Sequence, residues 1–176
     1  MSYVNVDIIN SCYIVMPNLV TLITSKRPDG GFNVMTASWV IPISRKPPLI
    51  ATAIAPTRYT YECLKYHKEF TISIVGPELK DLAWYCGTVT GRKVDKVKEK
   101  NIKLRSLSKI EVPGVDGALA ILGCKVWNDY DGGDHRIIVG EVVEVLVREG
   151  VFKDTWRNIE MLLYYGSGKF LSIKIP

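Results

Sequence analysis

The stretch GFNVMTASWV, residues 31–40, has the length and alternation of a strand but carries small polar side chains in unusual places. Successive side chains of a strand point to opposite faces of its sheet. One face reads Met35, Ala37, Trp39 and Ile41, which predicts the core side. The other face reads Val34, Thr36, Ser38 and Val40, with short hydroxyls where a solvent-facing strand would carry Lys or Glu. This second face is therefore predicted to be neither core nor ordinary surface.

The segments around this strand predict a sheet built mostly from antiparallel hairpins. Residues 18–26 alternate well and are joined to it by RPDGG, whose proline and glycines suit a tight turn. Further strands are expected at residues 49–55, 69–75, 117–131 and 135–147, the last two joined by GGD. Residues 43–48, ISRKPP, are expected to break the sheet pattern. Residues 155–170 are expected to form a short helix or turn followed by irregular chain.

Two segments change to the period of a helix. In residues 56–70, Thr57 is expected to cap a helix that places Tyr59, Tyr61 and Leu64 on roughly one face. Pro77 opens a second helix that ends at Gly87, and its apolar positions have helical spacing: Leu79, Leu82, Ala83 and Cys86. The sum is about six strands with two or three helices. It predicts a mainly-β α+β fold, a small antiparallel barrel with peripheral helices.

The composition of the 176 residues indicates one globular domain, residues 1–176, because 47% are hydrophobic and 23% charged. No run approaches the ~20 apolar residues that cross a bilayer, and the first residues do not resemble a secretory signal. We expect a cytoplasmic protein with no membrane partner. The cysteines lack a CxxC pair, so reduced thiols and no metal site are expected at Cys12, Cys63, Cys86 and Cys124.

Much of the net charge of +5 comes from residues 91–105, which carry seven basic and two acidic side chains. A solvated surface is the commonest explanation of such a run, and a groove for a small anionic ligand is the next. Zinc-finger spacing and the aromatic signature of RNA-binding domains are both missing, so no nucleic-acid partner is expected.

Two short motifs combine groups that bind phosphate. In PTRYT, residues 56–60, the free amides of a helix start would lie beside the hydroxyls of Thr57 and Thr60 and the planar fork of Arg58. Alone, this motif is better explained as a helix cap with an exposed arginine. In TGRKVDK, residues 90–96, Gly91 permits close approach of the backbone, and three cations follow it, Arg92, Lys93 and Lys96. Two weak signals in one small domain reinforce each other.

A third candidate is the hairpin tip DGGDHR, residues 131–136. It would place His135 at the rim of a pocket as a general acid or base. The alternative is a solvent-exposed histidine, since the sequence shows no carboxylate that must orient it. There is no GxSxG elbow or recognisable Cys/His nucleophile site, so hydrolysis is poorly supported.

The order of these segments resembles the flavin reductase-like family of FMN-binding split-barrel proteins, which includes flavoredoxins and ferric reductases. The likeness runs from about residue 17 to residue 147, through PNLVTLITS, NVMTASWV, PISRKPPLIATAIAPTRYT, EFTISIV, GTVTGRKVDK and CKVWNDYDGGDHRIIVGEVVEV, with LLYYGSGKF as a weaker match. The resemblance implies a six-stranded split barrel that forms a homodimer and holds FMN in a groove near the dimer interface.

The resemblance also implies roles for particular residues. The flavin ring or ribityl chain would contact Asn33, Thr36, Ala37 and Ser38, since a flat ring against a strand leaves no room for long side chains. The phosphate would lie among Thr57, Arg58, Tyr59, Thr60, Arg92 and Lys96. His135, in the GDH element, would lie on the open side of the flavin where NADH or NADPH docks. Ser73 stands where many relatives have Asn, and would contact the cofactor with less reach.

The implied function is that of an FMN-binding oxidoreductase. It would use NAD(P)H to reduce flavin, or pass electrons to an acceptor such as free flavin, a ferric chelate or a protein. An FMN-bearing electron carrier without its own nicotinamide site is the alternative. A barrel that has lost flavin and serves as a binding module is a third possibility.

Overall fold

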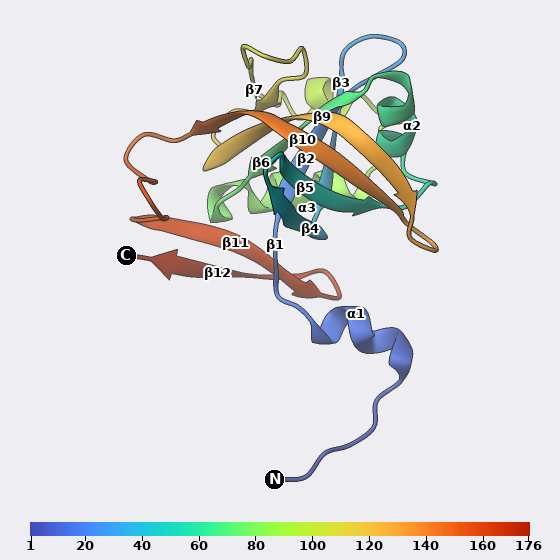
Figure 1. Ribbon diagram of the computed structural model, residues 1–176, viewed down its shortest axis with the longest axis vertical. Coiled ribbons are helices and arrows are strands. Elements are labelled where there is room, and N and C mark those ends of the chain that lie inside the picture. Colours follow the sequence, from blue (N-terminus) through green and yellow to red (C-terminus); the bar gives the residue numbers. More distant parts are fainter.

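Seven strands form one antiparallel sheet in the computed structural model, which describes all of residues 1–176 (Figure 1). Their order across the sheet is β3-β2-β6-β9-β10-β5-β4. They are β2 (Thr21–Lys26), β3 (Phe32–Ala37), β4 (Val40–Arg45), β5 (Pro48–Ile54), β6 (Glu69–Ile74), β9 (Ala120–Asp131) and β10 (Arg136–Val147). The predicted mainly-β α+β fold is confirmed, with seven strands in the main sheet where about six were expected.

A second, three-stranded sheet contains the C-terminal segment, in the order β1-β11-β12. Its strands are β1 (Asn18–Leu19), β11 (Ile159–Gly166) and β12 (Lys169–Ile175), and β7 (Leu104–Arg105) pairs with β8 (Gly114–Val115) elsewhere. The expectation of a helix or irregular chain at residues 155–170 was therefore wrong. Leu162 packs into one core cluster while Ile159 and Met161 pack into another, so β11 is buried on both faces and lacks the alternation that marks a strand.

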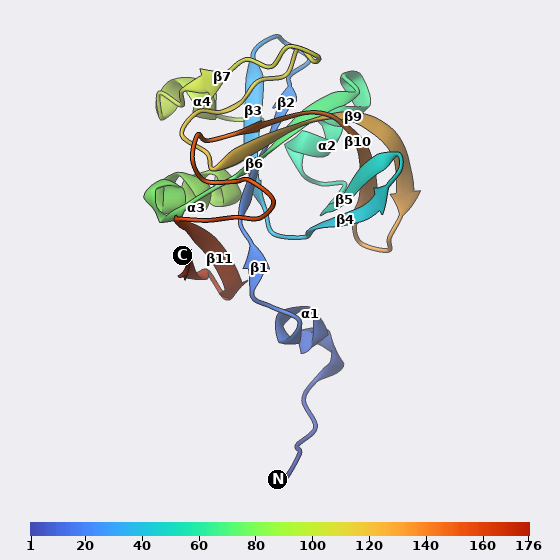
Figure 2. The ribbon, with the colours of Figure 1, turned by 60° about the vertical axis from the view of Figure 1, so that its left-hand side comes forward.

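The helices lie outside the main sheet (Figure 2). They are α1 (Ser11–Ile14) after a 3₁₀ turn at Ile8–Asn10, α2 (Tyr59–Tyr66), α3 (Lys80–Thr88) after a 3₁₀ turn at Pro77–Leu79, and α4 (Lys96–Glu99). The N-cap of α2 is Arg58 and no side chain caps it, so the expected capping role of Thr57 was wrong. No helix of the structure has the length and apolar character needed to cross a membrane.

Strand β3 lies between two core clusters. Val34 is fully buried in a cluster with Val20, Leu22 and α3, while Met35 and Ala37 pack at the edge of the other cluster. The expected core face was therefore right for these two residues only. Trp39 is 37% exposed and Ile41 is 61% exposed, because β3 ends at Ala37 and the chain leaves for the sheet edge as β4.

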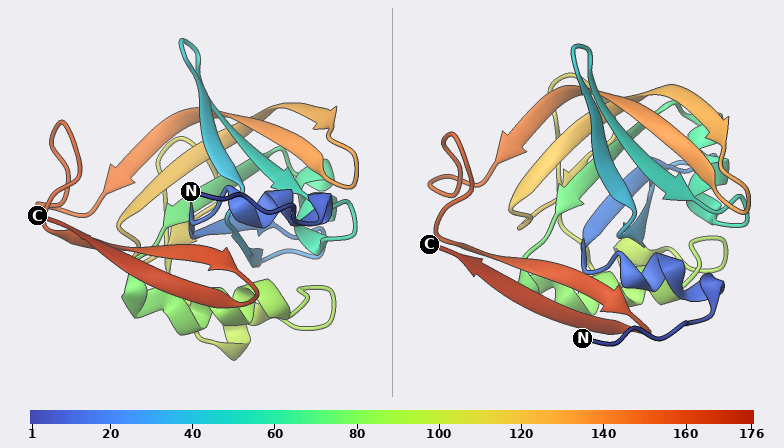
Figure 3. Two further views of the ribbon diagram at one scale, coloured as in Figure 1. Left: turned by 90° about the horizontal axis from the view of Figure 1, so that it is seen from below. Right: turned by 60° about the horizontal axis from the view of Figure 1, so that its bottom comes forward.

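Residues 43–48 do not break the sheet, as had been expected. They form the end of β4, a turn at Lys46 and Pro47, and the start of β5, with Arg45 opposite Pro48. The prolines misled the prediction because Pro47 lies in the turn and Pro48 is the first residue of β5, positions where a missing backbone N–H is tolerated. This hairpin stands out from the body of the protein in both views of Figure 3.

Candidate functional site

Three adjoining hollows form one groove between β3, the start of α2 and the end of α3, and Arg58 and Gly87 line all three. The lysine pocket is lined by Asn33, Met35, Thr57, Arg58, Tyr59, Thr60, Cys86, Gly87, Val89, Thr90, Gly91 and Lys96. The histidine pocket is lined by Met35, Thr36, Ala37, Ser38, Trp39, Ala53, Ile54, Ala55, Arg58, Gly87 and His135. The aromatic pocket is lined by Val20, Thr36, Ser38, Arg58, Ala83, Trp84, Gly87, Thr88, Tyr164, Gly168 and Phe170.

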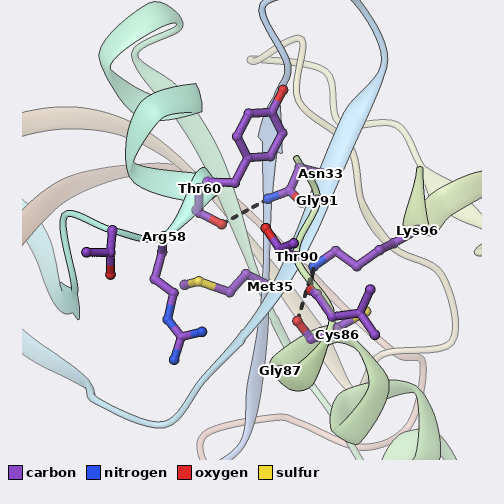
Figure 4. Close-up of a pocket in the computed structure, with 12 residues that line it drawn as sticks. Asn33, Met35, Arg58, Thr60, Cys86, Gly87, Thr90, Gly91 and Lys96 are labelled. Carbon is purple, nitrogen blue, oxygen red and sulfur yellow. Dashed lines mark hydrogen bonds between the residues drawn. The ribbon is translucent and has the colours of Figure 1, made fainter. Parts of the chain in front are cut away.

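Lys96 is a buried cation at one end of this groove (Figure 4). Only 3% of the residue is exposed, and burial lowers the pKa of its ammonium group. Nζ donates to the carbonyl oxygens of Cys86 at 3.1 Å and Val89 at 3.2 Å, and no carboxylate contacts it. Carbonyls at the end of α3 offset part of the charge. An ammonium group has three donors, so one is left to face an anionic ligand.

Other groups of the lysine pocket can also donate hydrogen bonds, and the Asn33 Oδ1 is a buried acceptor without a partner. The Asn33 amide donates to the Thr60 hydroxyl at 2.9 Å, which fixes the first turn of α2 against β3. The backbone amides of Tyr59 and Thr60 donate to no protein acceptor. Free amides at a helix start and a buried ammonium group suit an anion of the size of phosphate.

Gly91 lines this pocket and packs very closely against Asn33 and Tyr59. A Cβ there would lie 2.1 Å from Oδ1 of Asn33 and 2.9 Å from the Tyr59 ring. Because no real Cβ approaches another atom so closely, any side chain here would force Asn33 or Tyr59 to shift between β3 and α2.

The two basic motifs are only partly brought together. Arg58 lines the groove with Lys96, but its side chain is directed away from Lys96 in Figure 4. Arg92 lies outside the groove, where its guanidinium donates to the Thr57 carbonyl at 2.7 Å and to Glu62 at 3.2 Å. Lys93 is exposed. Arg92 therefore braces the loop of residues 90–95 against α2, and the structure does not place it against a ligand in the groove.

The middle of the groove is lined by Thr36 and Ser38, from the face that the sequence left unexplained, and by Ala37, from the predicted core face. The Thr36 hydroxyl donates to the Ala83 carbonyl of α3. A Cβ on Gly87 would make an ordinary contact of 3.4 Å with the Thr36 Cβ, and Thr36, Ala37, Ser38 and Gly87 present no long side chain to this part of the groove. It can hold a flat ring.

Ser73 is not part of the groove. It is fully buried in β6, and its hydroxyl accepts a hydrogen bond from the Val115 amide at 3.0 Å. The structure thus gives this side chain a partner within the protein, in place of the implied cofactor contact.

His135 lies at the rim of the histidine pocket. Its ring is 4.9 Å from the Trp39 ring, centroid to centroid, and Nδ1 lies 2.8 Å from Oδ1 of Asp134. The sequence analysis identified no carboxylate that must orient this histidine, but the neighbouring Asp134 contacts it. Trp39 and Asp134 together hold the imidazole toward the groove opening.

Residues 13–174 match the sequence pattern of the family described as "Flavin reductase like domain". The chain belongs to this family. An uncharacterized protein of Archaeoglobus fulgidus is 37% identical over 69% of this chain and 68% of its own length. The reductase component of a 4-nitrophenol monooxygenase from Rhodococcus opacus is 31% identical over 74% of this chain and 66% of its own length. The structure of an FMN-binding protein from Thermus thermophilus has a TM-score of 0.86 and 28% identity, covering 99% of this chain and 96% of that one.

These comparisons confirm the family resemblance and the split-barrel fold. They do not test the individual site residues of this flavin reductase-like chain, so those assignments rest on the groove itself. The aromatic pocket is the part that sequence reasoning missed. Trp84 of α3 and Phe170 of β12 meet edge-on at 6.2 Å, with Tyr164 beside them. One signal was available in the sequence, because Trp84 lies off the apolar stripe of its helix, and the structure shows that it is 49% exposed.

Proposed function

We propose that this flavin reductase-like protein binds FMN in the groove and acts as an NAD(P)H-dependent oxidoreductase. The observation that carries the proposal is a buried lysine without a carboxylate partner at one end of a groove whose middle is lined by small side chains. The similarity to an FMN-binding protein and to a monooxygenase reductase component supports it.

Each part of the groove then has a role. Lys96, the Thr60 hydroxyl and the free amides of α2 hold the phosphate, and Gly91 lets the backbone approach it. Thr36 to Ser38 form the wall for the ring, and Arg58 supplies positive charge beside it. His135 orients the nicotinamide at the open side. The bound flavin supplies the hydride and electron chemistry, while the protein supplies binding, orientation and electrostatics.

Reduction by nicotinamide nucleotides tests this function. The purified protein should bind FMN, and mixing with NADH or NADPH without oxygen should bleach the flavin band near ~450 nm in a stopped-flow instrument. His135→Ala should slow bleaching at least about tenfold with unchanged FMN affinity, because orientation of the nicotinamide is lost. His67→Ala is the matched control, since His67 pairs with Glu69 and does not line the groove.

The same experiment separates the alternatives. If both nucleotides leave bound FMN oxidised but a ferredoxin-like donor reduces it, the protein is an electron carrier and the reductase proposal is wrong. Failure to bind FMN at all would favour a barrel that serves as a binding module.

We further propose that the protein works as a homodimer. Residues 1–15, the N-terminal arm, extend from the body (Figure 1) and carry Asp7 as their only charged side chain. Tyr3 is 95% exposed and Ile8 87% exposed, and the edge strand β4 also exposes Ile41 and Ile43. Apolar surface of this extent is typical of an interface, and a second copy carries both the arm and the exposed edge.

Deleting residues 2–15 should therefore shift the protein from dimer to monomer, as measured by light scattering after size-exclusion chromatography. Replacing Ile8 and Ile9 by Ser should shift the equilibrium in the same direction without removing the arm. Both side chains are exposed in the single copy, so its fold should not change. A full-length protein that is monomeric at micromolar concentration would contradict the dimer.

A further inference from the structure

Arg27 connects the turn between β2 and β3 to the segment that carries Lys96. Only 16% of its side chain is exposed. Its guanidinium holds Asp29 through two bonds, Nε to Oδ1 at 2.8 Å and Nη2 to Oδ2 at 2.5 Å. The remaining nitrogen, Nη1, lies 3.3 Å from Oδ2 of Asp95. Because Asp29 holds the planar guanidinium of Arg27 at two nitrogens, the third nitrogen, Nη1, is fixed in the direction of Asp95.

Asp95 is the residue directly before Lys96. Its side chain caps α4, since Oδ1 accepts a hydrogen bond from the Lys98 amide at 3.1 Å. The other oxygen faces Arg27, and the ammonium group of Lys98 lies farther away, at 3.6 Å on a side chain that is 85% exposed. Asp95 thus links the cap of α4 to the Arg27 fork.

Helix α4 has only four residues, and a helix of this length is not stable by itself. The direction in which Lys96 leaves the backbone depends on what holds the start of this turn. Val97 packs at the edge of the core on one side, and Asp95 provides the polar anchor on the other.

We propose that Arg27, fixed by Asp29, is a positioning residue that holds Asp95 and thereby directs Lys96 toward the phosphate of the bound flavin. This inference rests on the proposed function, because it takes Lys96 as a phosphate ligand. Neither Arg27 nor Asp95 lines the groove, so their effect on a bound ligand is indirect, and Asp95 directly precedes Lys96 in the chain.

The test compares two ligands that differ only in the phosphate, FMN and riboflavin. We expect Arg27→Ala to weaken FMN binding about tenfold and riboflavin binding less than about twofold, since the ring contacts stay in place. Asp95→Asn should act in the same direction, because Asn still caps the helix but loses the charge that faces Arg27. The double variant should be no weaker than the worse single variant, since both changes break one connection.

Arg105→Ala is the control for loss of an arginine ion pair, because Arg105 pairs with Asp116 at 2.7 Å on a more exposed surface and is not among the ion-pair partners of Asp95 or Lys96. Its ratio of FMN to riboflavin affinity should equal that of the wild type. A wild type that prefers FMN strongly, with both variants keeping the full preference, would overturn the positioning role alone. A wild type that binds both ligands equally would overturn the phosphate assignment of Lys96 and this inference with it. If Arg27→Ala does not fold, Asp95→Asn decides the question.

Discussion

Lys96→Met is expected to weaken FMN binding roughly 10- to 100-fold and to leave riboflavin binding nearly unchanged. A hydrogen bond to a charged group contributes about 1.5–3 kcal/mol, and the ammonium group of Lys96 has no carboxylate that would compete with a phosphate. Methionine has a similar length and fills the same buried space without the charge. Titration of each flavin with protein, followed by quenching of flavin fluorescence, measures both affinities.

Lys93→Met is the control for this substitution. Lys93 belongs to the same basic loop but is exposed and does not line the groove, so its removal changes the net charge equally and should leave FMN affinity within about twofold. Equal losses in the two variants would show that the loop acts only through its overall charge, and the phosphate assignment of Lys96 would be wrong.

The dependence of FMN affinity on pH gives a second readout for Lys96. Burial lowers the pKa of this ammonium group from its ordinary value of 10.5, so the charge is lost at a lower pH than in an exposed lysine. FMN affinity of the wild type should fall as pH rises through the lowered pKa. The Lys96→Met variant lacks this group and should not show that fall, and a pH profile identical to that of the wild type would contradict the assignment.

The basic motif shows how far the sequence could lead at this site. TGRKVDK marked a candidate anion-binding loop, but it contains three cations and no information on their directions. In the structure, Lys96 is buried and donates to the Cys86 carbonyl of α3, whereas Arg92 donates to Glu62 of α2. These directions depend on contacts with α2 and α3, which are remote in sequence, so spacing within the motif could not separate a pocket residue from a brace.

The same limit applied to the strands. Hairpins such as β9–β10 were predictable because alternation and turn residues are local signals. Strand β11 was missed because it is covered on both faces, and the exposure of Trp39 was missed because β3 ends three residues before the end of the pattern at residue 40. The burial of β11 and the exposure of Trp39 both depend on tertiary contacts that the local sequence does not show. The aromatic pocket joins Trp84 of α3 to Phe170 of β12, about half of the chain apart, and no local pattern could connect them.

Gly91→Ala is expected to lower the free energy of unfolding by about 1–3 kcal/mol and to weaken FMN binding together with it. The new Cβ would lie 2.1 Å from Oδ1 of Asn33, so the Asn33 side chain or the loop must move. Asn33 is only 3% exposed and its amide donates to Thr60, so movement breaks the contact that fixes the start of α2. Urea unfolding and FMN titration measure the two effects.

A double variant tests whether this clash is the cause. Asn33→Ala removes the colliding atoms, so the loss of unfolding free energy in Gly91→Ala with Asn33→Ala should be smaller than the sum of the two single losses. Gly87→Ala is the contrasting change, because its Cβ would make an ordinary 3.4 Å contact with Thr36 while projecting toward the groove. It should preserve stability yet reduce affinity for FMN. If the losses from Gly91→Ala and Asn33→Ala were strictly additive, close approach at Gly91 would not explain why this pocket needs a glycine.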